Sequence, residues 1–137
     1  MNVNLEKEFI KNFIPLKKQE RILGLLKNRK KRDKLRKLLS HYVIFDKKNI
    51  ILIEKQYQNS EDIYKLLTKT YISNKCYIIS INNKLDGSML PLKEALDKVV
   101  GKLLGGTIII ISEYLAYYEG EEYKNRYILY NKEVDRN

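Results

Sequence analysis

The sequence predicts an α/β fold, a small mixed β-sheet with helices on its faces and a basic helical cap at its N-terminal end. Two observations carry this prediction. Apolar residues recur at helical spacing through the first forty residues, and β-rich runs alternate with helical patterns from residue 42 onward. With 137 residues, 44% of them apolar, the chain can bury a core as a single domain. We divide it into a basic helical region (1–41), a sheet core (42–130) and a tail (131–137).

The N-terminal region is expected to form helices around a basic elbow. A first helical pattern consists of Leu5, Phe9, Ile10 and Phe13. Pro15 ends it, because proline disfavours helix at the residue before it. A second pattern spans about 17–40, but residues 27–34 contain no apolar side chain, so a continuous helix would be solvated there on every face. We favour a break near Asn28, with two short amphipathic helices flanking the elbow.

Strand patterns begin at residue 42. Residues 42–45 and 50–53 are rich in β-branched and aromatic side chains, and the four residues between them suit a hairpin connection. The residues after Ser60 have one apolar face at helical spacing. We therefore expect a β-hairpin and then an amphipathic helix.

The centre of the chain predicts a βαβ unit. Residues 76–81 and 107–112 are nearly continuous apolar runs, as strands covered on both faces are. Between them, Pro91 begins an amphipathic pattern that Gly105-Gly106 ends. Two buried strands joined by a helix indicate parallel pairing with a right-handed crossover, so we expect a Rossmann-like arrangement.

The chain is expected to close with an antiparallel hairpin. Strands are predicted over 114–118 and 123–130, turning through Glu119-Gly-Glu-Glu122. Six tyrosines crowd these two strands. Tyrosines on a sheet can stack on unpaired bases, but aromatic residues also favour strands through packing alone. We favour packing, because the glutamates in the same stretch would repel phosphates.

Positive charge is concentrated in the first forty residues. The chain has 27 Lys and Arg against 17 Asp and Glu, a formal net charge of +10. Residues 1–40 contribute +9 of this charge and residues 41–137 contribute +1. An AT-rich genome, the compositional alternative, would have made both parts basic, so the asymmetry indicates a polyanionic partner. The cations of the elbow are Lys27, Arg29, Lys30, Lys31, Arg32, Lys34, Arg36 and Lys37.

We interpret the elbow as a surface that binds nucleic acid, RNA foremost, or another polyanion, in a protein without catalytic activity. Guanidinium and ammonium groups neutralise phosphates and release counterions, which gives affinity without reading a base sequence. A solvated, solubilising face is the structural alternative. Two functional alternatives stay open: an immunity or antitoxin-like module with an acidic protein partner, and a small metal-dependent nuclease. We expect no cofactor and no metal, and the oligomeric state stays open.

A cytoplasmic location without a membrane span is also expected. The N-terminal residues lack the charged-then-apolar layout of a signal peptide. Unbroken apolar stretches such as 108–111 are far shorter than the roughly 20 residues that a span needs. Cys76 has no second cysteine to pair with, which fits a reducing compartment.

The residues that could carry catalysis are His41, Asp86, Glu113, Glu119 and Glu121. Asp86 and Glu113 follow the two buried strands, at the edge where open parallel sheets bind ligands. A carboxylate pair there could hold Mg²⁺ for phosphodiester hydrolysis. Turn formation by Asp86-Gly87 is the structural alternative.

The other candidates each have two interpretations as well. His41, the sole histidine, could be a general base or a phosphate contact, or it could cap a helix end. Glu119 and Glu121 lie near Arg126 if the last hairpin forms. An ion pair across that hairpin would set the strand register, whereas carboxylates gathered near Asp86 would attract a cation.

Several motifs resemble those of an uncharacterised family of small bacterial proteins. They are Lys30-Lys-Arg-Asp-Lys34, Ser40-His41, Cys76-Tyr-Ile-Ile-Ser80, Leu85-Asp-Gly-Ser-Met-Leu-Pro-Leu-Lys-Glu-Ala-Leu96, Gly105-Gly-Thr107 and Leu115-Ala-Tyr-Tyr-Glu-Gly-Glu121. The similarity covers about residues 17–130. The chain departs from the family before the Leu-Ala-Tyr segment, where Ser112-Glu113-Tyr114 takes the place of a Pro-Gly turn. The resemblance implies no activity, cofactor or partner.

Overall fold

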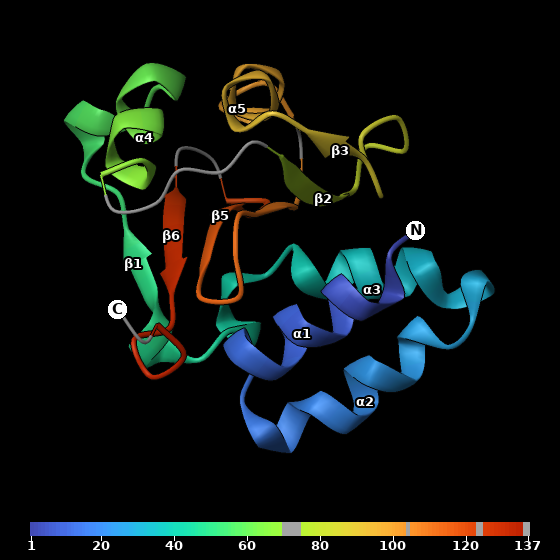
Figure 1. Ribbon diagram of the computed structural model, residues 1–137. Coiled ribbons are helices and arrows are strands. Elements are labelled where there is room, and N and C mark those ends of the chain that lie inside the picture. Colours follow the sequence, from blue (N-terminus) through green and yellow to red (C-terminus); the bar gives the residue numbers. More distant parts are fainter. Residues whose placement is uncertain (70–74, 104, 123–124, 136–137) are drawn as a thin grey trace.

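The computed structural model describes residues 1–69, 75–103, 105–122 and 125–135 (Figure 1). In these residues a six-stranded sheet has the strand order β1-β6-β5-β4-β2-β3. The strands are β1 (Ile50–Leu52), β2 (Cys76–Ser80), β3 (Met89–Leu90), β4 (Thr107–Ile110), β5 (Leu115–Glu119) and β6 (Arg126–Tyr130). The predicted α/β class is confirmed, but every pair of neighbouring strands is antiparallel, so the sheet is not mixed.

Helices cover both faces of the sheet (Figure 1). They are α1 (Val3–Phe13), α2 (Leu16–Leu26) and α3 (Arg32–Leu39) on one face, and α4 (Ser60–Leu67) and α5 (Leu92–Val99) on the other. Side chains alternate along the strands, so that Tyr77 and Ile79 belong to the first core and Ile78 to the second. No helix in the described parts of the chain combines the length and the apolar character that a bilayer crossing requires.

The predicted break in the N-terminal helices is confirmed. Ile14 is extended, with φ −114° and ψ 133°, and this ends α1 before Pro15. Asn28 is also extended, and its side chain accepts a hydrogen bond from the Lys30 amide of the short 3-10 turn η1 (Arg29–Lys31). The chain reverses at this elbow, and α3 runs back beside α2 (Figure 1).

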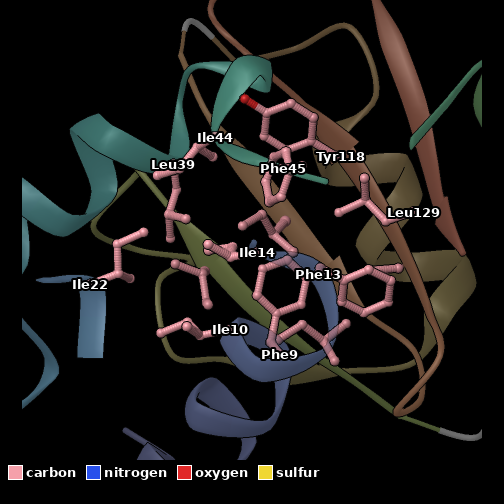
Figure 2. Close-up of a cluster of buried hydrophobic side chains, with 14 of the residues drawn as sticks. Phe9, Ile10, Phe13, Ile14, Ile22, Leu39, Ile44, Phe45, Tyr118 and Leu129 are labelled. Atoms are coloured by element: carbon pink, nitrogen blue, oxygen red, sulfur yellow. The ribbon is translucent and has the colours of Figure 1, made fainter. Parts of the chain in front are cut away.

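Aromatic contacts fasten the N-terminal helices to the sheet (Figure 2). The rings of Phe9 and Phe13 lie 5.0 Å apart, and Phe9 meets Phe45 edge-on at 6.0 Å. Phe45 in turn meets Tyr118 of β5 edge-on at 4.7 Å. Edge-to-face pairs stabilise a core beyond the apolar area they bury. The basic region is therefore part of the packed structure and does not project from it.

The hairpin predicted over 42–53 is wrong. Tyr42–Ile44 form a 3-10 turn, η2, and β1 pairs with β6, where Ile51 lies opposite Ile128. Phe45 is buried in the core between α1 and the sheet. The β-branched and aromatic residues at 42–45 therefore reflect packing of an irregular segment against the core. Such side chains suit a strand and a packed irregular segment equally well.

The predicted right-handed βαβ crossover, and with it the Rossmann-like arrangement, is also wrong. β2 and β4 are neighbours but antiparallel, with Ser80 opposite Thr107. The cause is β3, which returns along β2 so that Leu90 lies opposite Cys76. The turn between them includes Gly87 at φ 80°, a conformation that favours glycine. Because β3 has already reversed the chain, α5 leads into β4 from the end of the sheet where β2 finishes.

The predicted C-terminal hairpin is confirmed. β5 and β6 are antiparallel, with Glu119 opposite Arg126, and residues 123–124 of the expected second strand lie outside the described residues. The connection from β4 to β5 is tight, since the amides of Ile111 and Ser112 both donate to the Leu115 carbonyl. The Ser112 hydroxyl accepts from the Tyr114 amide at 3.3 Å, which closes the turn without Pro-Gly.

The two cores meet at the central strands, and this leads to a stability prediction. Ile79 of β2 and Ile109 of β4 are buried on opposite faces, 3% and 0% exposed. Ile79→Ala and Ile109→Ala should each lower the free energy of unfolding by about 2–5 kcal/mol, because each leaves a cavity in a packed core. Urea denaturation measures the loss, and a loss below about 1 kcal/mol for either variant would contradict the described packing.

Candidate functional site

Six of the eight predicted elbow cations face solvent on η1, α3 and the end of α2. They are Lys27, Arg29, Lys30, Lys31, Lys34 and Lys37, which we call the basic surface. Within the described residues, none of the six takes part in an ion pair. Asp33, the acid among them, is bound to Arg36. The basic surface is therefore a group of cations whose charge is not neutralised by an ion pair in the part of the chain that the structure describes.

Arg32, a seventh predicted cation, points into the protein and bridges two buried carboxylates. Its guanidinium binds Glu6 of α1 through Nη1–Oε1 at 2.5 Å and Nη2–Oε2 at 2.9 Å. It also binds Asp86 of the β2–β3 turn through Nη2–Oδ1 at 2.7 Å and Nε–Oδ2 at 3.0 Å. The side chains of Glu6 and Asp86 are 1% and 3% exposed. Burial alone would lower the pKa of Arg32, but the hydrogen bonds and charges of the two carboxylates outweigh it and raise that pKa.

Arg36, the eighth predicted cation, is buried one helical turn further on. Its Nη1 donates to the Ser80 carbonyl at 3.0 Å and to Asn83 Oδ1 at 2.7 Å, and its Nη2 donates to Asp33. The Asp86 carboxylate lies 3.7 Å from Nη1. Arg36 therefore holds α3 against the end of β2.

A tyrosine and a backbone amide complete this buried network. The Tyr77 hydroxyl donates to Glu6 Oε2 at 2.6 Å, and the Ser80 amide donates to Asp86 Oδ1 at 3.0 Å. Burial, together with the Glu6 carboxylate, raises the pKa of Tyr77 to about 12. Carboxylates that accept this many hydrogen bonds are held in one geometry. The network thus joins α1, α3 and the β2–β3 turn. It fixes the position of α3, the helix that carries part of the basic surface.

Two polar residues of this network, Glu6 and Ser80, lie within apolar patterns of the sequence, a signal of burial that we did not interpret. Glu6 lies three, four and seven residues before Phe9, Ile10 and Phe13, so it shares the apolar face of α1. Ser80 ends the buried run of β2, and its hydroxyl lies 2.7 Å from that of Thr107. A polar residue in phase with apolar ones indicates a buried partner, because an unpaired buried polar group is costly.

The carboxylates proposed for a metal site do not meet. Asp86 follows β2 and Glu113 follows β4, and because these strands are antiparallel the two residues lie at opposite ends of the sheet. Asp86 is neutralised by Arg32. In the part of the chain that the structure describes, no group of three or more His, Cys, Asp or Glu side chains is placed to hold a metal ion. The arrangement gives no support to two-carboxylate Mg²⁺ binding.

Glu119 is the centre of a second buried network, away from Asp86. Its Oε1 accepts from the Tyr117 hydroxyl at 2.6 Å, the Gly101 amide at 2.9 Å and Arg126 Nε at 3.0 Å. Arg126 also donates to Gln58 Oε1 at 2.9 Å. Burial and the adjacent Glu119 charge raise the pKa of Tyr117. The group therefore joins β5 and β6 to the end of α5 and to the segment before α4.

His41 and Glu121 are the catalytic candidates that the fold brings together. His41 Nδ1 lies 3.1 Å from Glu121 Oε1 at the surface, with about half of each side chain exposed. The imidazole makes no capping hydrogen bond at the start of η2, and His41 directly follows Ser40, the C-cap of α3. A pair this open to water lacks the buried, oriented surroundings that activate a general base.

The motifs noted in the sequence converge where α3 ends. The Ser40 hydroxyl accepts from the Gly106 amide at 3.0 Å, and the Ser40 carbonyl accepts from the Glu121 amide at 3.0 Å. Arg32, which binds Asp86 of the β2–β3 turn, lies on the same helix, about two turns earlier. No protein-family model, no curated protein and no solved structure matches this chain. Its function is therefore inferred from this arrangement of residues.

Proposed function

We propose that this protein binds nucleic acid, RNA foremost, through the basic surface, and that it does so as a binding module without catalysis. One observation supports this above the others. Six cations of the elbow are exposed and unpaired among the described residues, while Arg36 is buried, Arg32 is largely buried, and both hold the segment to the rest of the protein. A face that only keeps the protein soluble does not need to be held in place by buried arginine side chains.

The fixed support favours binding of a polyanion. A flexible basic tail loses conformational entropy when it is ordered on a ligand, whereas a helical elbow that is already packed loses less. Lysine and arginine side chains on it neutralise phosphates and release the counterions condensed on the nucleic acid. Such contacts position a backbone and do not read bases, so the affinity should vary little with base sequence.

A salt titration tests the proposal. If about five phosphates are neutralised, the slope of log affinity against log salt should be about −4 to −5 on duplex DNA and about −3.5 on single strands. Changing Arg29, Lys30, Lys31 and Lys34 together to Gln should bring the slope on duplex close to −1, because about 0.9 is lost for each phosphate contact. Fluorescence anisotropy at several salt concentrations measures both slopes.

The matched control removes the same charge elsewhere. Lys55, Lys65, Lys93 and Lys102 are exposed lysines in and around α4 and α5, on the other face of the sheet. Changing these four lysines together to Gln should leave most of the slope of log affinity against log salt. In both quadruple variants the free energy of unfolding should differ from that of the parent by at most roughly 0.5 kcal/mol per substituted site. No binding at 50 mM salt, or equal losses in the two variants, would overturn the proposal. Binding to polyglutamate but not to RNA would replace it with an acidic protein partner.

A further inference from the structure

A groove lies at the far end of α2 from the elbow. Its volume is about 380 Å³, and its lining residues are Lys17, Lys18, Arg21, Ile22, Leu38, His41, Val43 and Ile44. The lining combines four aliphatic side chains with four that are cationic or imidazole. Lys18 donates to the Val43 carbonyl at 3.1 Å, which ties α2 to η2 across the groove. The groove is therefore a formed feature between two fixed elements.

The groove and the basic surface are connected along α3. Lys34 and Lys37 lie three residues apart on one exposed face of that helix, and His41, a lining residue of the groove, follows its C-cap Ser40. On α2 the groove is lined by residues from Lys17 to Ile22, which lie about 15 Å to about 8 Å along the helix axis from Lys27, at about 1.5 Å per residue. On α2, Gly24 lies between Arg21 and the elbow, and no atom lies within 4 Å of the Cβ position it lacks. A nucleic-acid strand lying along α2 and α3 would meet cations at both ends and no obstruction at Gly24.

We propose that this groove receives one unstacked base of a single-stranded nucleic acid whose phosphates lie on the basic surface. The inference rests on the proposed function and adds to it the preferred form of the ligand. An apolar lining suits the faces of a base, and the Arg21 guanidinium and the His41 imidazole are planar groups of the kind on which bases stack. The His41 Nδ1 lies 3.1 Å from the Glu121 carboxylate. Lys17 carries charge for a neighbouring phosphate.

The size and the lining favour a single base over larger occupants. At about 380 Å³ the groove is near the lower end of the roughly 300–1,000 Å³ of small-molecule sites. Bases of a duplex are paired and stacked, so they cannot enter it without being extruded. An acidic peptide with an aliphatic side chain is the competing occupant; its carboxylate would bind the Arg21 guanidinium, but it would not stack on the His41 imidazole. The preference for single strands over duplex is therefore the distinguishing consequence.

The test compares strands of equal charge with and without bases. The parent protein should bind a ten-nucleotide oligouridylate about 5- to 150-fold more tightly than an abasic ribose-phosphate strand of the same length, the range expected for one stacked base. Arg21→Lys combined with His41→Gln keeps the charge of the arginine and removes both planar groups. This double variant should bind the two strands equally, at the affinity of the parent for the abasic strand. Lys93→Arg, a charge-conserving exchange on α5 at the other face of the sheet, should leave the difference between the strands unchanged.

The outcomes separate this inference from the proposed function. The base site is overturned if the parent binds the two strands equally, or if the double variant keeps the full difference between them. In either case, salt-dependent binding of both strands would still support the proposed function. Failure of the parent to bind any strand at 50 mM salt overturns both. An oligonucleotide with 2-aminopurine as its central base gives a second readout, because its fluorescence should change on the parent and not on the double variant. Release of that signal by an acidic peptide but not by oligouridylate assigns the groove to a protein partner and overturns the inference.

Discussion

Arg32→Met is expected to lower the free energy of unfolding by about 3–5 kcal/mol, although Arg32 lies in a run of surface cations. Removing the guanidinium leaves the Glu6 carboxylate buried without its cation and leaves the Asp86 carboxylate with Arg36, 3.7 Å away. An uncompensated buried charge is far more costly than the loss of an exposed one. Urea denaturation of the variant and of the parent at pH 7 measures the difference.

Two further variants make this prediction specific. Lys30→Met, two residues away and exposed, should change the free energy of unfolding by less than roughly 0.5 kcal/mol. Adding Glu6→Gln and Asp86→Asn to Arg32→Met should recover part of the loss, because the unpaired charges are then removed as well. A loss for Arg32→Met below about 1 kcal/mol would mean that the side chain faces solvent. The same reasoning excludes Arg32 from any set of charge exchanges intended to test binding.

Arg126→Met is expected to cost about 3 kcal/mol, at the lower end for a broken buried pair. The side chains of Glu119 and Arg126 are 7% and 15% exposed. Glu119 keeps the Tyr117 hydroxyl and the Gly101 amide as donors, which moderates the loss. An exposed cross-strand pair would contribute roughly 0.2–1 kcal/mol, so the size of the effect reports the burial of this pair.

A double-mutant cycle isolates the pair from its surroundings. Glu119→Gln, Arg126→Met and the combination should show a coupling energy of about 0.5–3 kcal/mol. Glu119→Gln alone should destabilise the protein, because the charge of Glu119 is compensated by Arg126. A variant Glu119→Gln that is more stable than the parent would contradict the described network.

Local patterns predicted the elements whose signals lie within a few residues. The break at Asn28 and the last hairpin follow from spacing and turn residues, and both are confirmed. The direction of β4 could not be predicted in the same way. It depends on β3, whose two residues, Met89 and Leu90, are too few to show the alternation of a strand. The pairing of β1 with β6 joins distant segments, and no local pattern encodes it.

The site was predicted in composition but not in geometry. Every cation of the elbow has the same local signal, a basic residue among basic residues. Their separation into exposed and buried depends on the phase of α3, in which Arg32 and Arg36 lie on the side of Leu35 and Leu39. That phase becomes defined once the helix is known to begin at Arg32. The partners Glu6 and Asp86 come from other elements, so the ion pairs required the tertiary structure.

The position of β6 within the sheet bears on when the protein can fold. β6 lies between β1 and β5, and it contributes Tyr127 and Leu129 to the core under α1 and α2. At roughly 5–20 residues per second, a ribosome needs about 4–17 s to pass from the end of α3 to the start of β6. Throughout that interval the N-terminal helices have no completed sheet to cover their apolar faces. Folding of this chain is therefore a late event of synthesis. The segment that must remain without its sheet until then is residues 1–40, which contribute +9 of the net charge of +10.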